Sequence, residues 1–526
     1  MEFRELEIFH GGCRVSVMAR TWHPVELTFE AEDPPDDPYG EACLDVRFEH
    51  ESGRTATVPG FWDGGDTFRT RFAPPETGTW AWETIADDLG LDETGSFEAG
   101  SGDSESALHD HGYLVADERA LRHADGEPCF WLADTAWSAS TRATTDEWTE
   151  YLDYRVDQGF NVVQVNALRQ FDGSRPHDRI PFEDWDISRP NHDYFRRLDD
   201  LVAMAHERGV VPALVALWFD YAGANEDWGV PEEYRHDHTP EQARTLGRYL
   251  GARYGAYGAT WLVSGDSEFD ETVLPVYRAA AEALGEACQY PLRAAHQPGG
   301  QNTPAIVNDE DWLDFHVYQS GHTHDRGVPE SQARVNRALH PARPVLNGEP
   351  CYADMEEYGG DEVFDRETVR AAGWLSVLAG ANAGLTYGAL GIWPWHRAGD
   401  TFEAADRWGD PKPWDEALTF PSADDYGRLA ELLDGKQVHA LSPRPDLLDE
   451  SETGEAAAVT PEAVVVYLRT GRAVTLTDAP PVADWQWVDP ASGDANGVEA
   501  NESDRQTDVE APPFDDDALL VGERSD

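Results

Sequence analysis

Lysine is almost absent from this chain of 526 residues and occurs only at Lys412 and Lys436. Arginine carries nearly all of the positive charge, and 40 Lys and Arg side chains oppose 101 Asp and Glu, for a formal net charge of −61. Such a charge repels nucleic acids and anionic membrane surfaces, so we expect neither as a partner. Acidic residues spread over the whole length are instead typical of a halophilic protein, because concentrated salt screens their mutual repulsion.

Cysteine is scarce as well. The five cysteines are scattered and share no spacing typical of a metal site: Cys13, Cys43, Cys129, Cys288 and Cys351. We therefore expect neither a structural zinc site nor a disulfide framework.

Long apolar runs are also missing. No run is long enough to span a bilayer, and the segment Met1–Glu7 lacks the apolar stretch of a secretory signal peptide. We therefore expect a cytoplasmic protein without a membrane partner. No glycine-rich phosphate-binding loop occurs, so we expect no cofactor. The pattern predicts no particular oligomeric state.

Short runs that alternate polar and apolar side chains dominate residues 1–105, for example Val25–Phe29 and Cys43–Phe48. Pro and Gly clusters separate the runs, and this pattern predicts an antiparallel β-sandwich. Trp80 and Trp82 occupy alternate positions of one run, so we expect both in the core. The polar run 99–111 is predicted to be a linker.

Residues 106–434 show a different pattern, in which a strand followed by a helix is repeated eight times. Such repetition over roughly 300 residues predicts one (β/α)8 barrel, a TIM barrel. The expected strands are 130–137, 161–166, 210–218, 261–266, 291–296, 312–318, 344–348 and 384–393.

Residues 435–526 again consist of short strand-like runs. They predict a small C-terminal β-sandwich with an acidic loop at 495–508. The expected fold class is thus multidomain α/β, a TIM barrel flanked by N-terminal and C-terminal β-sandwich domains.

Two carboxylic acids, Asp266 and Glu349, each follow a glycine at the end of a predicted barrel strand. Catalytic groups of such barrels lie at the carboxyl ends of the strands. Glycoside hydrolysis commonly needs two carboxyl groups that flank the scissile bond, so we predict these two as the catalytic pair. The alternative is that Asp266 caps the next helix and Glu349 is a solvated loop residue. Glu268 is a possible substitute for Asp266.

Polar and aromatic side chains follow almost every predicted strand. They are candidates for substrate binding, because polar groups bind sugar hydroxyls and aromatic rings stack on sugar rings. The candidates are Asp134, Trp137, Gln164, Asn166, Trp218, His296, Gln297, Tyr318, Gln319, His322, Tyr352 and Trp393. Each of them could equally be a structural residue, so the prediction rests on the ensemble.

Two His-x-His pairs, His109 with His111 and His322 with His324, have a spacing that can bind a metal ion. The first pair lies in the predicted linker. The second follows the sixth strand, whereas metal-dependent hydrolase barrels carry such a pair after the first strand. We therefore expect no metal site.

Motifs such as Phe130-Trp-Leu-Ala-Asp-Thr-Ala-Trp137 and Asn347-Gly-Glu-Pro-Cys-Tyr352 run in a familiar order along residues 121–433. The others are 159–165, 261–266, 312–315, 319–322 and 371–381. Together they resemble the apiosidase-like family of glycoside hydrolase barrels. In that family the acid after strand four and the glutamate after strand seven are catalytic, which implies Asp266 and Glu349 here. Ser264 is a departure, since the family has glycine at that position.

The flanking regions resemble known companions of such barrels. Residues 68–82 are similar to the N-terminal β-sandwich that precedes many of them, and 470–475 with 487–493 to a small C-terminal sandwich of the collagen-binding type. We do not infer collagen binding.

A glycoside hydrolase acting on an oligo- or polysaccharide is thus expected. The alternatives are a catalytically inactive carbohydrate-binding barrel and a metal-dependent hydrolase. The sugar, the linkage and the choice between retention and inversion stay open at this point.

The charge makes one prediction about stability. We expect the melting temperature to rise steeply as KCl approaches molar concentrations, because salt screens the repulsion between carboxylates that destabilises the compact state. Thermal unfolding followed by circular dichroism across a KCl series measures this. A flat dependence on KCl would contradict the halophilic interpretation.

Overall fold

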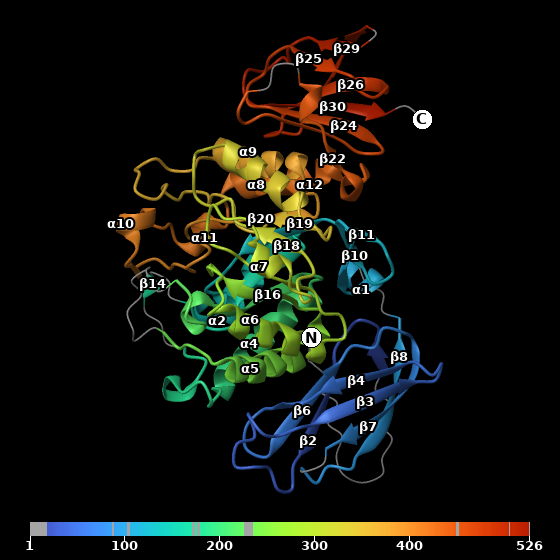
Figure 1. Ribbon diagram of the computed structural model, residues 1–526, viewed down its shortest axis with the longest axis vertical. Coiled ribbons are helices and arrows are strands. Elements are labelled where there is room, and N and C mark those ends of the chain that lie inside the picture. The colour runs from blue at the N-terminus through green and yellow to red at the C-terminus, as the bar shows by residue number, and fades with distance from the viewer. Residues whose placement is uncertain are drawn as a thin grey trace.

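A computed structural model describes residues 18–86, 89–101, 106–170, 174–175, 179–225, 235–448, 452–503 and 505–524. In Figure 1 the N-terminal strands lie at one end of the molecule, a barrel in the middle and the C-terminal strands at the other end. The predicted domain boundary near residue 105 and Cys13 lie outside the described residues. No described helix is long and apolar enough to cross a membrane.

Two sheets with a common core form the N-terminal part. The strands are β1 (Met18–Arg20), β2 (Val25–Glu30), β3 (Asp45–His50), β4 (Thr55–Pro59), β5 (Phe61–Trp62), β6 (Thr67–Phe72), β7 (Gly78–Ile85) and β8 (Thr94–Gly100). Their orders are β1-β8-β7-β3-β4 and β2-β6-β5. Trp80 and Trp82 are buried in the core, as predicted. The pairs are antiparallel, as predicted, except that the edge strand β1 pairs with β8 in parallel.

The predicted linker at 99–111 contains helix α1 (Ala107–His111). The ring of His109 stacks on His23 with centroids 4.2 Å apart and meets His206 at 4.8 Å. This packing holds the segment between the N-terminal part and the barrel, so it is not a free linker. A three-stranded antiparallel sheet follows, made of β9 (Leu114–Asp117), β10 (Ala120–His123) and β11 (Pro128–Cys129).

Eight parallel strands form the barrel, as the sequence predicted. They are β12 (Trp131–Thr135), β13 (Val162–Asn166), β15 (Val211–Trp218), β16 (Thr260–Gly265), β17 (Arg293–Ala294), β18 (His316–Tyr318), β19 (Val345–Asn347) and β20 (Gly384–Tyr387). The order is β17-β16-β15-β13-β12-β20-β19-β18. Between β17 and β18 a single bridge, His296 with Val317, connects the two edges. The barrel is therefore nearly closed, with its weakest seam at His296.

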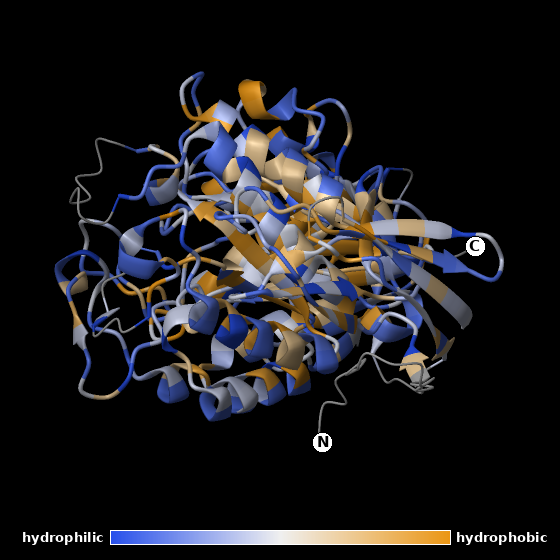
Figure 2. Cartoon of the chain, turned by 90° about the horizontal axis from the view of Figure 1, so that it is seen from below, coloured by the Kyte–Doolittle hydropathy of each residue, from blue (hydrophilic) through white to orange (hydrophobic). Residues whose placement is uncertain are grey.

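Helices surround the strands, and Figure 2 shows hydrophobic residues gathered inside and hydrophilic residues outside. The helices are α2 (Ala139–Arg142), α3 (Thr145–Asp157), α4 (His192–Glu207), α5 (Pro240–Tyr254), α6 (Leu274–Ala287), α7 (Ala305–Asn308), α8 (Gly327–Arg337), α9 (Arg366–Ala379), α10 (Ala405–Trp408), α11 (Trp414–Ala417) and α12 (Pro421–Leu433). Thr144 and Glu147 form a capping box at the start of α3, and Thr239 and Gln242 do so at α5. These caps satisfy backbone N–H groups that would otherwise lack acceptors. A two-residue antiparallel pair, β14 (Ser174–Arg175) with β21 (Thr401–Phe402), joins the loops that follow β13 and β20, and β14 lies at the left of the barrel in Figure 1.

Buried charges fasten the N-terminal part to the barrel. Arg253 of α5 is fully buried and donates to Asp199 of α4 at 2.7 Å and to Asp63 at 3.0 Å. Arg71 of β6 also donates to Asp199, at 2.8 Å. Removing one partner of such a network leaves an uncompensated buried charge, so the network fixes one orientation of the two parts.

The C-terminal part has two sheets that share a core. Its strands are β22 (Ser442–Pro443), β23 (Ala456–Val459), β24 (Ala463–Leu468), β25 (Val474–Thr477), β26 (Val482–Val488), β27 (Ala495–Val498), β28 (Ala500–Glu502), β29 (Gln506–Val509) and β30 (Ala518–Arg524). The sheet orders are β22-β23-β24-β30-β26-β27 and β25-β29-β28. The predicted acidic loop at 495–508 was wrong, because strands occupy most of it. In β29, Thr507 and Val509 point inward and Asp508 outward, so the acidic residues lie on the exposed face.

Candidate active site

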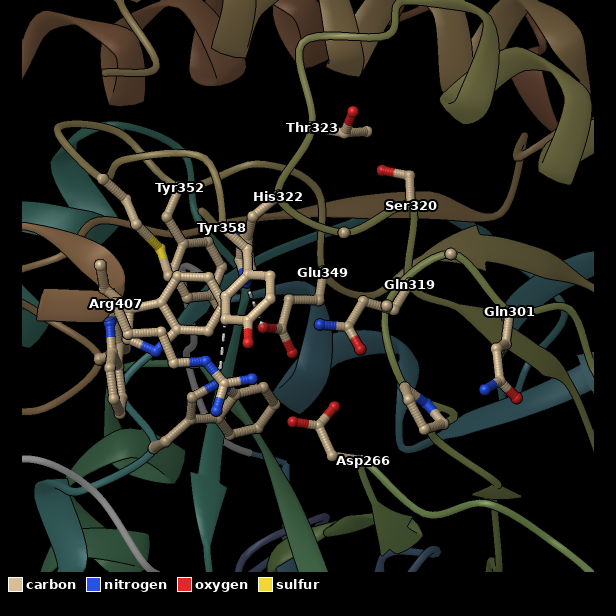
Figure 3. Close-up of a pocket in the computed structure, with 18 of the residues that line it drawn as sticks. Asp266, Gln301, Gln319, Ser320, His322, Thr323, Glu349, Tyr352, Tyr358 and Arg407 are labelled. Carbon is tan, nitrogen blue, oxygen red and sulfur yellow. Dashed lines mark hydrogen bonds and ion pairs between the residues drawn. The ribbon is translucent and has the colours of Figure 1, made fainter. Parts of the chain in front are cut away.

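Asp266 and Glu349 lie at the same end of the barrel and line one cleft (Figure 3). Asp266 directly follows β16, and Glu349 stands two residues beyond β19. The cleft has a volume of about 630 Å³, within the range of pockets that enclose small ligands. The two acids therefore meet in a space that can hold a substrate.

Asp266 has a backbone φ of 47°, in the left-handed region that residues other than glycine rarely adopt. Asn225 holds this conformation: its amide donates to the carbonyl of Asp266, and its side-chain oxygen accepts from the N–H of Glu268 at 2.8 Å. Gly265 is required before the acid, because a Cβ there would lie 1.9 Å from the ring of Trp218. The chain thus leaves the strand in one fixed direction beside the indole.

Glu349 is positioned by the two residues before it. The side-chain oxygen of Asn347 accepts the N–H of Glu349 at 3.3 Å, and its amide donates to Ser320 at 2.8 Å and Ser376 at 3.0 Å. Gly348 lets the chain pass close to the neighbouring strand β18, since a Cβ there would lie 2.3 Å from a valine of that strand. The Asn-Gly pair therefore fixes where the glutamate leaves the barrel.

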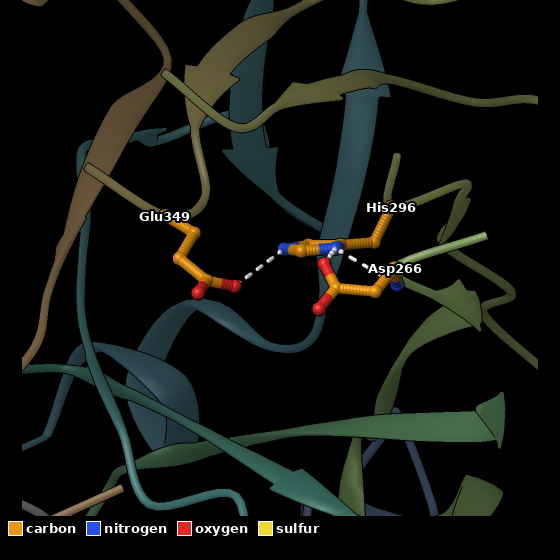
Figure 4. Close-up of side chains that lie close together, drawn as sticks. All are labelled: Asp266, His296 and Glu349. Atoms are coloured by element: carbon orange, nitrogen blue, oxygen red, sulfur yellow. Dashed lines mark hydrogen bonds and ion pairs between the residues drawn. The ribbon is translucent and has the colours of Figure 1, made fainter. Parts of the chain in front are cut away.

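An imidazole lies between the two acids (Figure 4). Nδ1 of His296 is 3.6 Å from Oδ1 of Asp266, and Nε2 is 3.3 Å from Oε2 of Glu349. The backbone N–H of Asp266 donates to Nδ1 at 3.4 Å, which favours a proton on Nε2, facing Glu349. One ligand atom from each of the three side chains lies within 4.8 Å of the others. The other Glu349 oxygen is 3.3 Å from Nε2 of His322.

The three groups have opposite charge preferences. Burial, and then the nearby Glu349 carboxylate, raise the pKa of Asp266 to about 7. Burial alone would also raise the pKa of Glu349, but hydrogen bonds from His296 and His322 outweigh it and lower that pKa. The pKa of His296 is raised, since the contacts with Glu349 and Asp266 overcome the effect of burial. Near neutral pH, Asp266 can therefore hold a proton while Glu349 is ionised.

Half of the predicted substrate-binding residues line the cleft, namely Trp137, Trp218, Gln319, His322, Tyr352 and Trp393. The indole N–H of Trp137 donates to the hydroxyl of Tyr352 at 2.9 Å, and its ring centroid is 5.6 Å from that of Trp218. The ring of His322 packs on Tyr352 at 4.7 Å. These rings form a continuous aromatic wall next to the acids, a surface suited to the C–H faces of sugars.

The other half do not line it, and these are Asp134, Gln164, Asn166, His296, Gln297 and Tyr318. Asp134 is buried and accepts from Arg155 at 2.6 Å and Tyr151 at 2.9 Å, so its partners are structural. Gln164 donates to the carbonyl of Gly348 at 2.9 Å and thereby supports the strand end before Glu349. Neither residue lines the cleft: Asp134 faces helix α3 on the outer side of its strand, and Gln164 contacts the end of a neighbouring strand.

The remaining predicted residues are also buried and do not line the cleft. The amide of Gln297 donates to the carbonyl of Ala295 at 3.1 Å, and the hydroxyl of Tyr318 donates to that of Pro329 at 3.2 Å. Asn166 is also buried, with 2% of its surface exposed. His296 lies beneath the cleft, where it contacts the two acids instead of substrate.

Several lining residues were missed by the sequence prediction, among them Gln170, Phe219, Gln301, Tyr358, Arg407 and Trp408. Tyr358 belongs to the loop after β19, and Arg407 and Trp408 to α10 in the loop after β20. These three residues lie well beyond the strand ends, so a prediction that considers only residues next to the strand ends does not find them. Aromatic residues in long loops after late strands are the signal that could have found them.

The described residues offer one group with metal-ligand composition, Asp266, His296 and Glu349. In it the two imidazole nitrogens face different carboxyl groups (Figure 4), so each nitrogen is paired with one of the acids. Histidines of the two His-x-His pairs have other contacts. Nδ1 of His111 lies 2.7 Å from a carboxyl oxygen of Asp125, and the ring of His324 packs on Phe364. This arrangement is better suited to proton transfer than to metal binding.

The fold is similar to solved structures of sugar-cleaving enzymes. A glycoside hydrolase family 5 protein from Bacteroides vulgatus ATCC 8482 has 22% identity and a TM-score of 0.69, over 80% of this chain and 95% of that chain. A proposed glycoside hydrolase from the same strain has 17% identity and a TM-score of 0.73, over 96% and 99%. At such identities the likeness shows the fold. None of the curated proteins matches the chain.

Two family models match parts of the sequence. Residues 18–87 match a domain of unknown function, DUF5060. Residues 115–440 match the family described as apiosidase-like, catalytic domain, and this range contains the barrel and both acids. Because the match spans more than half of the chain, the chain belongs to the apiosidase-like family and is a glycoside hydrolase.

Proposed function

We propose that the chain hydrolyses a glycosidic bond in an oligo- or polysaccharide, with Asp266 as general acid/base and Glu349 as nucleophile. The observation that carries this proposal is the pair of carboxyl groups on either side of His296, with their pKa values shifted in opposite directions. Two carboxyl groups whose environments separate their pKa values are suited to acid and base roles at the same pH.

The separation of the acids favours retention of configuration. Carboxyl groups are about 5–5.5 Å apart in retaining glycosidases and about 6.5–9.5 Å apart in inverting ones, which need room for a water. Here one oxygen of each acid lies within 4.8 Å of the other. Glu349 would attack the anomeric carbon while Asp266 protonates the departing oxygen. Asp266 would then take a proton from water as that water displaces Glu349 from the sugar.

Asp266 is better suited to the acid role than its neighbour Glu268. Glu268 is exposed, and its carboxylate accepts from the amide of Gln301 at 3.1 Å. Asp266 lies beside Glu349, and its raised pKa supplies a proton near neutral pH. His296 supports the division of roles, because its bond to Glu349 stabilises the ionised nucleophile.

The domain arrangement belongs to the same proposal. We assign residues 1–105 and 435–526 to flanking β-sandwich domains and 106–434 to the catalytic barrel. Separate hydrophobic cores in the two flanking parts support this division. The acidic composition is proposed to be an adaptation to concentrated salt.

Two other functions can be distinguished from this one by measurement. A catalytically inactive barrel would bind oligosaccharides and cleave none, which a panel of aryl glycosides and polysaccharides at high salt would reveal. A metal-dependent hydrolase would contain zinc or manganese at one equivalent per chain, which elemental analysis would reveal. The substrate panel also identifies the sugar used in the tests that follow.

The roles of the acids predict different effects of leaving group. Glu349→Ala should abolish turnover of every substrate, because no nucleophile remains. Asp266→Ala should lower kcat/KM by about 10²- to 10⁴-fold for sugar leaving groups and much less for nitrophenyl groups, which depart without protonation. Steady-state kinetics on a nitrophenyl glycoside and an oligosaccharide of the same sugar measure this.

Glu268→Ala is the matched control, since it removes a nearby carboxylate from the same cleft. It should keep the parent dependence on leaving group. Full activity in both the Asp266 and the Glu349 variants would show that the assignment is wrong. An effect of leaving group confined to Glu268→Ala would transfer the acid role to that residue.

The electrostatics of the cleft predict a pH dependence. In the parent, kcat/KM should fall as pH rises through about 7, because Asp266 loses its proton there. His296→Gln removes an imidazole whose contacts lower the pKa of both acids, so both limbs of the profile should move to higher pH. His316→Gln is the control: His316 is a buried imidazole of β18 that does not line the cleft. An unchanged profile in His296→Gln would contradict the role given to this imidazole.

A further inference from the structure

An exposed tyrosine stands at the edge of the cleft. Tyr358 is 66% exposed, more than any other large hydrophobic residue of the described chain. It lies in a hairpin between β19 and α9, and its ring faces the space above the acids (Figure 3). A single exposed side chain is common on protein surfaces and implies nothing by itself. Its neighbours make it part of a larger structure.

Arg407 and Trp408 of α10 complete a stack with this tyrosine. The guanidinium carbon of Arg407 is 4.7 Å from the ring centroid of Tyr358 and also 4.7 Å from that of Trp408. The two ring centroids are 5.7 Å apart. We call these three side chains the aromatic platform. Cation–π contacts of this kind attract a guanidinium to the rings.

Arg407 carries a positive charge in a strongly acidic protein. The chain has 101 acidic residues against 40 basic ones. Yet within the described residues no carboxylate pairs with Arg407, and its guanidinium N–H groups have no hydrogen-bond acceptor. Its charge reaches the active site, where it contributes to lowering the pKa of Asp266, against the larger raising effects. The free donors of Arg407 are therefore available to a ligand in the cleft.

The backbone holds the platform together. The N–H of Glu356, at the base of the hairpin, donates to the carbonyl of Trp408 at 3.1 Å. Glu356 and Val363 also form a bridge across the hairpin. On its inner side Trp408 touches His322, with ring centroids 5.4 Å apart, and His322 contacts Glu349. The platform is thus built from two loops and lies one side chain away from the nucleophile.

The lining of the cleft also includes a polar surface that contains Gln301 and Gln319. The side-chain oxygen of Gln319 has no partner in the described structure. Figure 3 shows the platform and these amides on different sides of the acids. A cleft with aromatic rings on one side and amides on another suits a sugar, which has apolar C–H faces and a rim of hydroxyls.

We propose that Tyr358, Arg407 and Trp408 form a binding subsite for a second sugar residue, next to the one whose bond is cleaved. The proposal rests on the proposed function and deepens it, since it requires a substrate of at least two sugar units. The exposed ring of Tyr358 stacks on the sugar, and Arg407 donates to an oxygen substituent of that sugar. The substituent is a hydroxyl or a carboxylate, which share this acceptor chemistry.

The test uses a glycan array of neutral and uronic-acid oligosaccharides at high salt. The full chain with Glu349→Gln serves as the non-hydrolysing parent. Adding Tyr358→Ala should weaken binding of di- and longer saccharides by about tenfold, since an aromatic contact of ~1.4 kcal/mol corresponds to that factor. Monosaccharide binding should change by less than about twofold. Tyr154→Ala is the control, because Tyr154 is an exposed tyrosine of α3 outside the cleft.

Arg407→Leu, in the same parent, distinguishes the two acceptors. A loss confined to uronic-acid glycans identifies a carboxylate, and an equal loss for neutral glycans identifies a hydroxyl. Either result supports the subsite, and no loss removes Arg407 from it. Unchanged oligosaccharide binding in Tyr358→Ala, or no glycan bound by the parent, would overturn the proposal. If glycans bind in a way that depends on Tyr358 but the protein with an intact Glu349 hydrolyses none of them, the subsite is supported and the proposed function is refuted.

Discussion

The contact of one imidazole with two acids, a half-buried Asp266 and a buried Glu349, is the interaction on which the active site depends. Two carboxylates this close, and largely removed from water, would repel each other strongly if both were ionised. His296 contacts both acids. The pKa values of Asp266 and His296 are raised and that of Glu349 is lowered, so the two carboxyl groups are not both ionised near neutral pH. With a proton on Asp266 and a proton on Nε2 of His296 facing Glu349, Glu349 is the ionised member of the group. The same distribution of protons prepares one acid to donate and the other to attack.

The barrel brings these groups together from three separate strands. Asp266 follows β16, His296 lies at the seam between β17 and β18, and Glu349 follows β19. The glycine before each acid lets the backbone pass close to a neighbouring side chain. This close packing fixes the direction in which the chain leaves each strand. The seam has one bridge, His296 with Val317, and a hydrogen bond from the N–H of Asp314 to the carbonyl of Arg293 at 2.9 Å. The weakest join of the barrel therefore coincides with the residue that links the acids.

Much of this arrangement was predictable from the sequence, because eight strand–helix repeats leave few ways to fold. The order of the strands and the shared location of Asp266 and Glu349 follow from that repetition. What strand ends cannot show is the direction of each side chain: Asp134 turns to a buried arginine, and His296 turns beneath the cleft. Residues far along a loop are equally hidden, since nothing local indicates that Tyr358 folds back over the acids.

The central claim is that the two acids act by double displacement, with Glu349 bonded transiently to the sugar. The most direct measurement is the anomeric configuration of the first product, followed by proton NMR in D₂O before mutarotation proceeds. The close approach of the acids predicts that the product first appears with the configuration of the substrate. First appearance of the opposite anomer would contradict the claim, because it would require a water, not Glu349, to attack the sugar.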